Sequence, residues 1–332
     1  MTHGGDIYKY AKKLGCKPEE IIDFSSNINL YQPEFTFSLE AKTIARYPET
    51  NYTSLKESIA KKYALEQEQI TLYGGATAGI YALFQELQAE NVYLYAPLYG
   101  EYEQAARMAK KSVYLVNRID ELEEKVEKKA IVVFVNPSTP EGTHYELEAL
   151  FSMWMKRKCT IILDESFLEF ESLPSYRKMI NEYEKLYIIQ SFSKYYSCAG
   201  VRVGAIFSHQ KSSAKLSQLP WNLSVLDTHF LQERLVDEDF HKQTQEYHLK
   251  QKEQLQNILE KSNLFDEVVQ SDANFILCYA KRGEAIFEHL LEAKILVRKC
   301  GSFDYLNDNW LRFAVKSAEA HQKLEETLRA FS

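Results

Sequence analysis

A lysine stands among hydroxyl-bearing residues directly after an apolar run near the middle of the chain. The segment SFSKYYSCAGVRVG (191–204) follows the run KLYIIQ and contains Lys194 and, eight residues later, Arg202. A buried ammonium group is costly unless a partner or a reaction requires it. A lysine amine that its surroundings keep neutral can form a Schiff base with an aldehyde. Lys194 is therefore either one half of a structural ion pair or a reactive group.

Three short apolar runs indicate strands that are covered on both faces. They are AIVVFV (130–135), CTIIL (159–163) and LYII (186–189). Continuous apolar character is typical of strands in a parallel sheet, whereas alternation is typical of half-exposed strands. Segments with helical patterns lie before and between the runs, at 76–88, 145–157 and 174–184. This alternation predicts a doubly wound α/β domain in which helices flank a mostly parallel central sheet.

Each apolar run ends in polar residues, and these would meet at one edge of the predicted sheet. The polar segments are NPSTPEG, DES and QSFSK. Ligands of open α/β sheets bind outside the carboxyl ends of the strands. Asp164 and Glu165 would then lie near Lys194, and an acid there is either a structural partner or a cofactor ligand. Pyridoxal phosphate (PLP) requires a carboxylate for its pyridinium nitrogen as well as a lysine.

The segment YGGATAG (73–79) could hold the phosphate of PLP, because it opens the amphipathic stretch 76–88. Free backbone N–H groups and the dipole at a helix N-terminus favour an anion. Hydroxyl donors and a fixed positive charge would come from Ser191, Ser193 and Arg202. A plain loop before a helix would also explain the two glycines, and the segment matches neither the Rossmann pattern G-x-G-x-x-G nor the Walker pattern G-x-x-x-x-G-K-[ST].

A serine-nucleophile site is a rival interpretation of the lysine segment. Ser191-Phe192-Ser193-Lys194 fits S-x-x-K, the motif of penicillin-binding proteins and class A β-lactamases. Those enzymes also need S-D-N and K-T-G elements, but here SDAN (271–274) is only a near match and no K-T-G is present. The PLP interpretation is therefore preferred.

The composition is that of an ordinary globular protein and excludes several functional classes. The chain has 332 residues and a net charge of −7, and it shows no basic stripe, which argues against general nucleic-acid binding. Its five scattered cysteines fit neither a disulfide framework nor a C-x-x-C metal pair. No apolar run is long enough for a signal core or a membrane span. We therefore expect a cytoplasmic protein with no metal, no nucleic-acid partner and no membrane partner.

Three parts are expected along the chain. Residues 1–45 would be an N-terminal arm that packs with a small domain, because DFSSNINLYQPEF is polar and irregular. Residues 46–230 would be the large cofactor-binding domain. Residues 231–332 would be a smaller α+β domain, which begins with a long polar helical stretch. Its strand candidates are NFILCY, KILVRKC and WLRFAV, and its further helical segments are 282–293 and 318–331.

The lysine segment resembles the motif S-x-[ST]-K-x7-R-x-G of fold-type-I PLP enzymes, the aspartate aminotransferase superfamily. The chain is most similar to the branch that holds histidinol-phosphate aminotransferases and L-threonine-O-3-phosphate decarboxylases, and the resemblance runs from residue 3 to about residue 328. HGGDI (3–7) and DFSSNIN (23–29) resemble the opening of the decarboxylases. Phe167, in DESFLEF, stands where aminotransferases usually have a tyrosine over the cofactor hydroxyl.

This resemblance implies that Lys194 bonds to PLP and that Asp164 contacts its pyridinium nitrogen. Tyr99, in PLYGEY, would stack on the pyridine ring. Tyr47 would reach the phosphate of the neighbouring subunit, which implies a homodimer with shared active sites. The phosphate would be held by the backbone of the glycine-rich turn and by side chains of the lysine segment: Gly75, Ala76, Thr77, Ser191, Ser193 and Arg202.

The resemblance also implies where a phosphorylated amino-acid substrate would lie. Arg312 would bind the substrate carboxylate, and Asn29 and Asn274 would lie near it. The substrate phosphate would be met by His3 of the arm or by basic residues near the C-terminus: Arg298, Lys299 and Lys316.

Two places depart from the family pattern. Thr139, in STPEG (138–142), stands where the family has an asparagine that bonds the phenolic oxygen of PLP. A threonine hydroxyl could still donate there, with a shorter reach. Ala78 and Gly79 stand where relatives often carry an acidic residue. Both departures concern the electronic tuning of PLP rather than its binding.

The expected function is a PLP-dependent decarboxylation of O-phosphothreonine or O-phosphoserine to an amino-alcohol phosphate for cobamide synthesis. The arm motif and Phe167 favour this activity. An aminotransferase of the histidinol-phosphate type is the alternative. A protein of this fold that binds PLP without catalysis is disfavoured, because Lys194 and Asp164 are both present.

Overall fold

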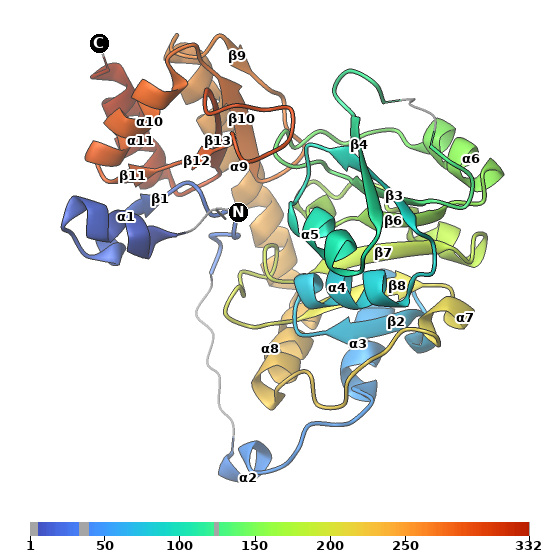
Figure 1. Ribbon diagram of the computed structural model, residues 1–332. Helices are drawn as coiled ribbons and strands as arrows, with labels where there is room; N and C mark the ends of the chain where they lie inside the picture. Colours follow the sequence, from blue (N-terminus) through green and yellow to red (C-terminus); the bar gives the residue numbers. More distant parts are fainter. Residues whose placement is uncertain (1–5, 33–39, 123–125, 332) are drawn as a thin grey trace.

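A seven-stranded sheet forms the centre of the molecule, with the strand order β2-β8-β7-β6-β5-β3-β4 (Figure 1). This computed structural model describes residues 6–32, 40–122 and 126–331. The strands are β2 (Ile70–Tyr73), β3 (Asn91–Ala96), β4 (Ser112–Asn117), β5 (Ile131–Val135), β6 (Thr160–Asp164), β7 (Leu186–Ser191) and β8 (Gly204–Ser208). Neighbours from β7 to β4 are parallel, whereas β8 is antiparallel to both β7 and β2. The predicted α/β architecture with a mostly parallel sheet is confirmed.

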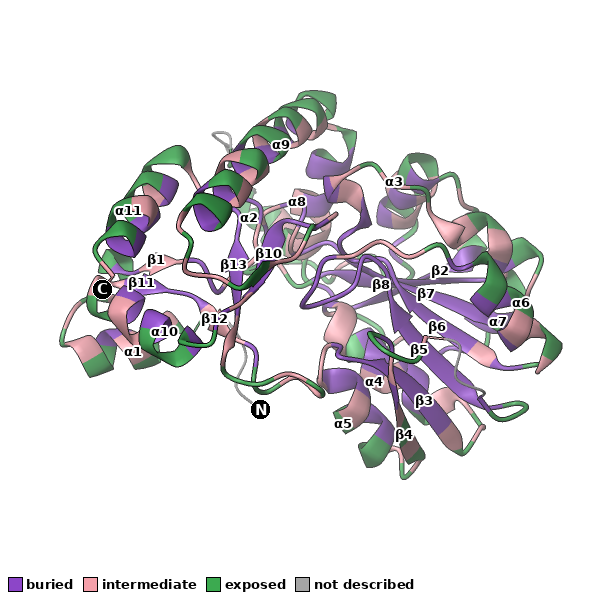
Figure 2. Cartoon of the chain, turned by 90° about the horizontal axis from the view of Figure 1, so that it is seen from above, coloured by how far each residue is buried: buried purple, intermediate pink, exposed green. Residues whose placement is uncertain are grey.

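Helices cover both faces of this sheet, which explains the continuous apolar runs (Figure 2). In β5, Val132 and Phe134 belong to one core and Ile131 and Val133 to another. Every residue of β5 is at most 1% exposed, and burial of one such side chain stabilises the fold by about 1.5–3 kcal/mol. The first core includes residues of α3 (Thr53–Tyr63), α6 (Glu148–Lys156) and α8 (Val225–Val236), and the second includes residues of α4 (Ala76–Glu86) and α5 (Glu101–Met108).

A four-stranded antiparallel sheet, in the order β12-β13-β10-β9, organises the C-terminal part. Its strands are β9 (Glu267–Val268), β10 (Phe275–Tyr279), β12 (Arg298–Lys299) and β13 (Trp310–Ala314). A third core joins this sheet to three helices, α9 (Glu238–Lys261), α10 (Gly283–Glu292) and α11 (Ala318–Arg329). The N-terminal helix α1 (Ile7–Leu14) contributes Ala11 to the same core. The division into domains after residues 45 and 230 stays a prediction.

Several segments differ from their expected structure. The N-terminal segment holds α1, a helix for which no expectation was made, and Asp6 caps this helix by accepting a hydrogen bond from the Lys9 amide. KILVRKC forms two short strands, because β11 (Ile295–Leu296) pairs with β1 (Ile22–Asp23) while β12 pairs with β13. The long polar helical stretch breaks at Asp237, whose carboxylate accepts from the Phe240 amide and caps α9.

The remaining helical elements are short. The segment expected to be a crossover helix at 174–184 forms a 3-10 helix, Tyr176–Asn181. The other short helices are α2 (Ala41–Ile44), α7 (Gln210–Ser213) and the 3-10 turns Pro18–Glu20, Gln67–Gln69 and Leu168–Phe170. None of the helices within the described ranges is long and apolar enough to cross a membrane.

Strand β8 brings three distant segments together at the carboxyl end of the sheet. Its first residue, Gly204, pairs with Ser191 of β7 on one side and with Tyr73 of β2 on the other. A Cβ at position 204 would lie 2.2 Å from the amide nitrogen of Ala76, so only glycine fits this close approach. The lysine segment and the glycine-rich turn are therefore neighbours in space.

Candidate active site

A cavity of about 400 Å³ opens at the carboxyl ends of β5, β6 and β7. The N-terminal segment Ser25–Ile28 forms another part of its wall. The volume is within the range of sites that bind small molecules. Most of the residues that the sequence singles out line this cavity: Ala76, Thr77, Tyr99, Thr139, Asp164, Ser191, Ser193, Lys194, Arg202, Arg298 and Arg312.

The glycine-rich turn and Arg202 form a cradle that suits an anion. Gly75 directly precedes α4 and has a φ of +92°, a left-handed conformation that glycine adopts without strain. A Cβ on Gly75 would lie 2.5 Å from an Nη atom of Arg202, so the absence of a side chain lets the guanidinium approach the turn. Arg202 also donates to the Ser193 hydroxyl at 3.2 Å. Gly75 lies behind Ala76 and Thr77, which face the cavity.

Asp164 ends β6 and holds a fixed orientation at the floor of the cavity. One carboxylate oxygen accepts from the Tyr102 hydroxyl at 2.7 Å, and the other accepts from the Ser166 amide at 2.9 Å. Burial, and then the charge of Asp164, raise the pKa of Tyr102 well above its ordinary value, so this phenol stays a donor. Sequence reasoning missed Tyr102. The feature that could have indicated Tyr102 is its position on α5, three residues after Tyr99 and on the helix face that packs toward the sheet.

Tyr99 lies at the cavity beside the start of α4. Its hydroxyl is 3.3 Å from the Thr77 hydroxyl, and its ring meets Tyr102 edge-on. Burial raises the pKa of Tyr99. The ring is therefore held from two sides, as a residue that stacks on a planar ligand would need to be.

Lys194 enters the cavity from the loop that follows β7. Its Nζ lies 4.7 Å from the centre of the Phe167 ring. Burial lowers the pKa of Lys194, Asp164 opposes this effect, and the positive charges of Arg312 and Arg202 lower it further. These surroundings favour the neutral amine, which is the nucleophilic form.

Arg312 lies on β13 and reaches across to the loop after β5. Its guanidinium donates to the Thr139 hydroxyl at 3.1 Å and to the carbonyl oxygen of Ser25 at 3.3 Å. Burial lowers the pKa of Arg312 to about 10. The Thr139 hydroxyl thus accepts from an arginine of the C-terminal part, a contact that its position in the sequence does not indicate.

Of the other basic candidates, Arg298 alone lines the cavity within the described residues. It donates to the Ser302 hydroxyl at 2.6 Å. Lys299 points elsewhere and lies within 3.6 Å of Glu284 and 3.8 Å of Asp308. Lys316 donates to the carbonyl oxygen of Ser26 at 2.7 Å, and burial lowers its pKa to about 8. Lys316 therefore supports the wall of the cavity from behind.

Asn29 and Asn274 do not line the cavity, contrary to the expected position beside the substrate carboxylate. Asn29 donates from its side chain to the carbonyl oxygen of Tyr195 at 2.8 Å, and its amide donates to the carbonyl oxygen of Lys194 at 2.9 Å. Asn274 donates to the carbonyl oxygen of Asn27 at 2.7 Å. Each side-chain amide donates to a backbone carbonyl oxygen, so Asn29 holds the N-terminal segment on the lysine loop and Asn274 holds it beside the start of β10.

Two further expected site residues lie away from the cavity or outside the described residues. Tyr47 is 79% exposed and packs against Trp221 with the ring centres 4.7 Å apart. His3 lies outside the described residues.

Glu165, next to Asp164, does not line the cavity and serves the scaffold. Its carboxylate accepts from the Tyr176 amide at 2.8 Å and from the Ser175 hydroxyl, and Arg177 lies 3.4 Å away. Burial raises the pKa of Glu165. Of the two acids that end β6, the cavity therefore receives only Asp164.

A buried ion pair behind Thr139 was also missed. Arg118, whose side chain is fully buried, donates to both carboxylate oxygens of Glu141, at 3.0 and 2.6 Å. The same guanidinium donates to the carbonyl oxygens of Tyr95 at 2.7 Å and Thr139 at 3.1 Å. No motif marks Arg118, which directly follows β4, so only its complete burial distinguishes it.

The comparison with known families decides the classification. A model of the family described as aminotransferase class I and II matches residues 19–331. The chain belongs to this family. The family uses PLP, as the lysine segment predicts.

Two kinds of relative are similar to this chain in sequence or in fold. Over 97% of its length, the chain is 32% identical to the adenosylcobalamin biosynthesis bifunctional protein CobDQ of Leptospira interrogans, of which it spans only 40%. It is 24% identical to the threonine-phosphate decarboxylase of Salmonella typhimurium, with 99% of this chain and 96% of that protein covered. The crystal structure of the histidinol-phosphate aminotransferase from Clostridium acetobutylicum matches with a TM-score of 0.81 and 26% identity, covering 92% of this chain and 98% of that one.

The cavity residues fit the cofactor of the family. The anion cradle of Ala76, Thr77 and Arg202 would hold its phosphate, because three kinds of donor meet there: helix N–H groups, hydroxyls and a guanidinium. Asp164 would contact the pyridinium nitrogen, and Lys194 would bond to the aldehyde carbon. Bound in this way, PLP acts as an electron sink for a bond to the substrate Cα.

Proposed function

We propose that this chain decarboxylates a phosphorylated amino acid, L-threonine O-3-phosphate or L-serine O-phosphate, to an amino-alcohol phosphate used in cobamide synthesis. The observation that carries the substrate class in this proposal is the charge of the cavity wall. Among its described residues, Asp164 is the one carboxylate, and it faces Lys194, Arg202, Arg298 and Arg312. Arg202 would serve the cofactor phosphate, so two arginines remain for two anionic groups of a substrate.

The positions of these two arginines suggest which anionic group each one binds. Arg312 is buried, so its fork suits a planar carboxylate. Arg298 lies beside Ser302, and a guanidinium with an adjacent hydroxyl suits a phosphate. An O-phosphorylated amino acid carries both groups. The Salmonella relative is named for such a substrate, which supports this assignment.

The direction of the reaction depends on which bond to Cα stands perpendicular to the cofactor ring. A carboxylate that Arg312 holds in the plane of the ring favours loss of the proton, whereas one that is tilted out of this plane favours loss of carbon dioxide. Phe167 and residues 25–28 also line the cavity, where they could contact a tilted carboxylate. Lys194 would then return a proton to Cα, and the lowering of its pKa by burial and by the charges of Arg312 and Arg202 makes this proton transfer easier.

An aminotransferase of the histidinol-phosphate type is the second candidate. It is favoured by the similarity to the Clostridium structure, whose identity of 26% exceeds that of the Salmonella decarboxylase. The same arginines would serve an anionic amino donor and a phosphorylated acceptor, so the charge of the cavity is compatible with both reactions.

A homodimer with shared sites belongs to the same proposal. Tyr47 and Trp221 form an exposed aromatic pair, and Leu219 and Leu226 are also exposed. Large apolar side chains that gather on a surface are typical of subunit interfaces. In this arrangement Tyr47 would meet the cofactor phosphate of the partner, and His3 would meet the substrate phosphate.

Product analysis with and without 2-oxoglutarate tests the proposal. We expect purified, PLP-loaded protein to release carbon dioxide from O-phosphothreonine or O-phosphoserine without any 2-oxo acid. Lys194→Ala protein is the control and should release none. Stoichiometric formation of glutamate from histidinol phosphate and 2-oxoglutarate, without carbon dioxide, would establish the aminotransferase instead.

A further inference from the structure

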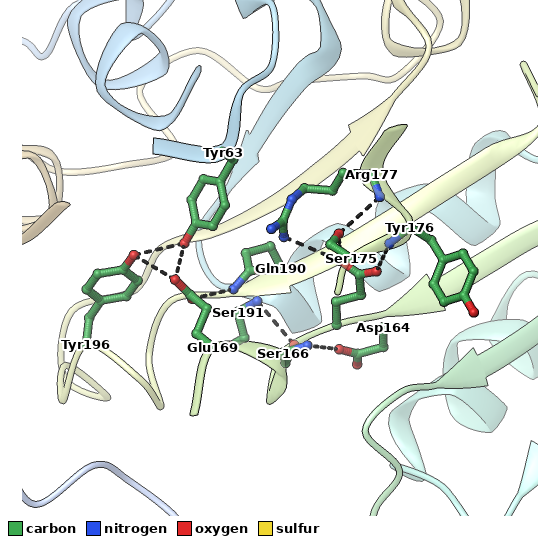
Figure 3. A network of polar contacts seen from close by, with 11 residues as sticks. Tyr63, Asp164, Ser166, Glu169, Ser175, Tyr176, Arg177, Gln190, Ser191 and Tyr196 are labelled. Carbon is green, nitrogen blue, oxygen red and sulfur yellow. Dashed lines mark hydrogen bonds and ion pairs between the residues drawn. The ribbon is translucent and has the colours of Figure 1, made fainter. Parts of the chain in front are cut away.

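The carboxylate of Glu169 joins parts of the chain that are far apart in the sequence (Figure 3). One oxygen accepts from the hydroxyls of Tyr63, at 2.9 Å, and Tyr196, at 3.0 Å. The other oxygen accepts from the side-chain amide of Gln190 at 3.1 Å. The two hydroxyls are themselves 2.9 Å apart. Glu169 therefore links the end of α3, strand β7 and the loop that carries Lys194.

The four side chains of this network, Tyr63, Glu169, Gln190 and Tyr196, are shielded from water, so their polar groups depend on one another for hydrogen bonds. Gln190 and Tyr196 are fully buried, and Tyr63 is 7% exposed. Burial raises the pKa of Glu169, and the hydroxyls of Tyr63 and Tyr196 act against this effect. A buried polar group that loses its partner costs about 1–3 kcal/mol. The four side chains therefore hold one another in a single arrangement.

Two of these groups belong to the loops that form the cavity. Tyr196 follows Lys194 by two residues, and Glu169 follows Phe167 by two residues. The hydrogen bond from Tyr196 to Glu169 thus ties the lysine loop to the segment that descends from Asp164 through Phe167. Neither Glu169 nor Tyr196 lines the cavity itself.

We propose that Glu169 is a positioning residue for Lys194. Through Tyr196 it sets the height of the Lys194 amine over the Phe167 ring, and with it the degree to which the amine is kept from water. The proposal rests on the assignment of Lys194 as the residue that bonds PLP, and it is independent of the reaction that follows.

The variants Tyr196→Phe and Tyr63→Phe form a matched pair that tests the proposal. Each removes one hydroxyl bonded to Glu169, but only Tyr196 belongs to the lysine loop. The readout is the pKa of Lys194 in protein without cofactor, obtained from the pH dependence of its acetylation by trace acetic anhydride and quantified by mass spectrometry. Thermal unfolding is followed in parallel.

Tyr196→Phe is expected to raise the pKa of Lys194 by about one unit, because a looser loop admits water to the amine. Tyr63→Phe should lower the thermal stability to a similar degree and leave the pKa of Lys194 unchanged. Glu169→Ala should raise the pKa of Lys194 as Tyr196→Phe does. Glu169→Gln keeps an oxygen acceptor, so the pKa of Lys194 should stay close to that of the unmodified protein.

The proposal is overturned if Tyr196→Phe and Glu169→Ala leave the acetylation profile of Lys194 as in the unmodified protein. It is also overturned if Tyr63→Phe shifts that profile as much as Tyr196→Phe, because the network would then be structural only. No substrate is present in this experiment, so an incorrect substrate assignment cannot produce either result.

Discussion

The amine of Lys194 stands 4.7 Å above the ring of Phe167, and this ring carries no hydroxyl. Phe167 is 4% exposed and meets Phe275 edge-on, so the amine rests on an apolar floor. A cation over an aromatic face gains about 0.5–2 kcal/mol, but burial and two arginines act in the opposite sense and lower the pKa of Lys194. These surroundings therefore lower the pKa of Lys194 and shift the amine toward its neutral form.

Arg312→Leu is expected to raise the pKa of Lys194, because the charge of Arg312 disfavours the ammonium form. At a given pH a smaller fraction of the amine is then neutral, and the pH profile for incorporation of PLP moves to higher pH. Absorbance changes during loading of the apoprotein would measure this. Lys299→Gln, which removes a charge outside the cavity, is the control. Equal profiles for Arg312→Leu and the unmodified protein would contradict the expectation.

Arg298→Gln is expected to raise the KM for O-phosphothreonine by about 10- to 100-fold, since a hydrogen bond to a charged group contributes about 1.5–3 kcal/mol. Binding of PLP should be unaffected, because Arg202 and not Arg298 lies at the anion cradle. Lys299→Gln is again the matched control: it is the next residue on β12, but its charge is used by Glu284 and Asp308. An equal KM in both variants would show that Arg298 does not bind the substrate.

Glu141→Gln is expected to lower the free energy of unfolding by about 3–5 kcal/mol, because it leaves the buried Arg118 guanidinium without a counter-charge. The loop that bears Thr139 should loosen as well, since Arg118 also bonds its carbonyl oxygen. Urea unfolding would measure the loss. Glu103→Gln, which removes the half-buried partner of the exposed Arg107, should change the stability by no more than about 0.5 kcal/mol. Similar losses in the two variants would argue against a special role for the buried pair.

His321 makes the stability sensitive to acid. Burial lowers its pKa from 6.5 to about 4, and its Nε2 accepts from the Lys316 amide, which requires the neutral ring. Between these two pKa values the unfolded state binds more protons than the folded state, so the free energy of unfolding falls as the pH falls through this window.

His321→Gln should therefore flatten the dependence of stability on pH between about 6.5 and 4. Chemical denaturation at a series of pH values would show this. Some slope should remain, because burial also lowers the pKa of His241 to about 4. A slope identical to that of the unmodified protein would show that His321 titrates normally in the folded state.

Local pattern was sufficient for β5, β6 and β7, three neighbouring strands of the seven-stranded sheet, and for the polar residues at their carboxyl ends. The apolar runs of β5, β6 and β7 report burial on both faces, and the residues that follow a parallel strand must appear at its carboxyl end. Asp164, Lys194 and Thr139 follow from these two facts, because each stands within a few residues of a strand end. The spacing from Lys194 to Arg202 and the glycine-rich turn then indicated an anion site, and the resemblance supplied their roles.

Contacts between segments that are far apart in the chain were decided only by the tertiary structure. The register of β8 places Gly204 against Ala76, and the fold of the arm places the amide of Asn29 against the carbonyl oxygen of Lys194. The sequence did not indicate the partners of Tyr102, of the Arg118–Glu141 pair or of the Glu169 network, because these partners are set by strand order and helix packing. A hydrogen bond needs its two atoms within about 3 Å, and the periodicity of a single segment holds no information about the position of another.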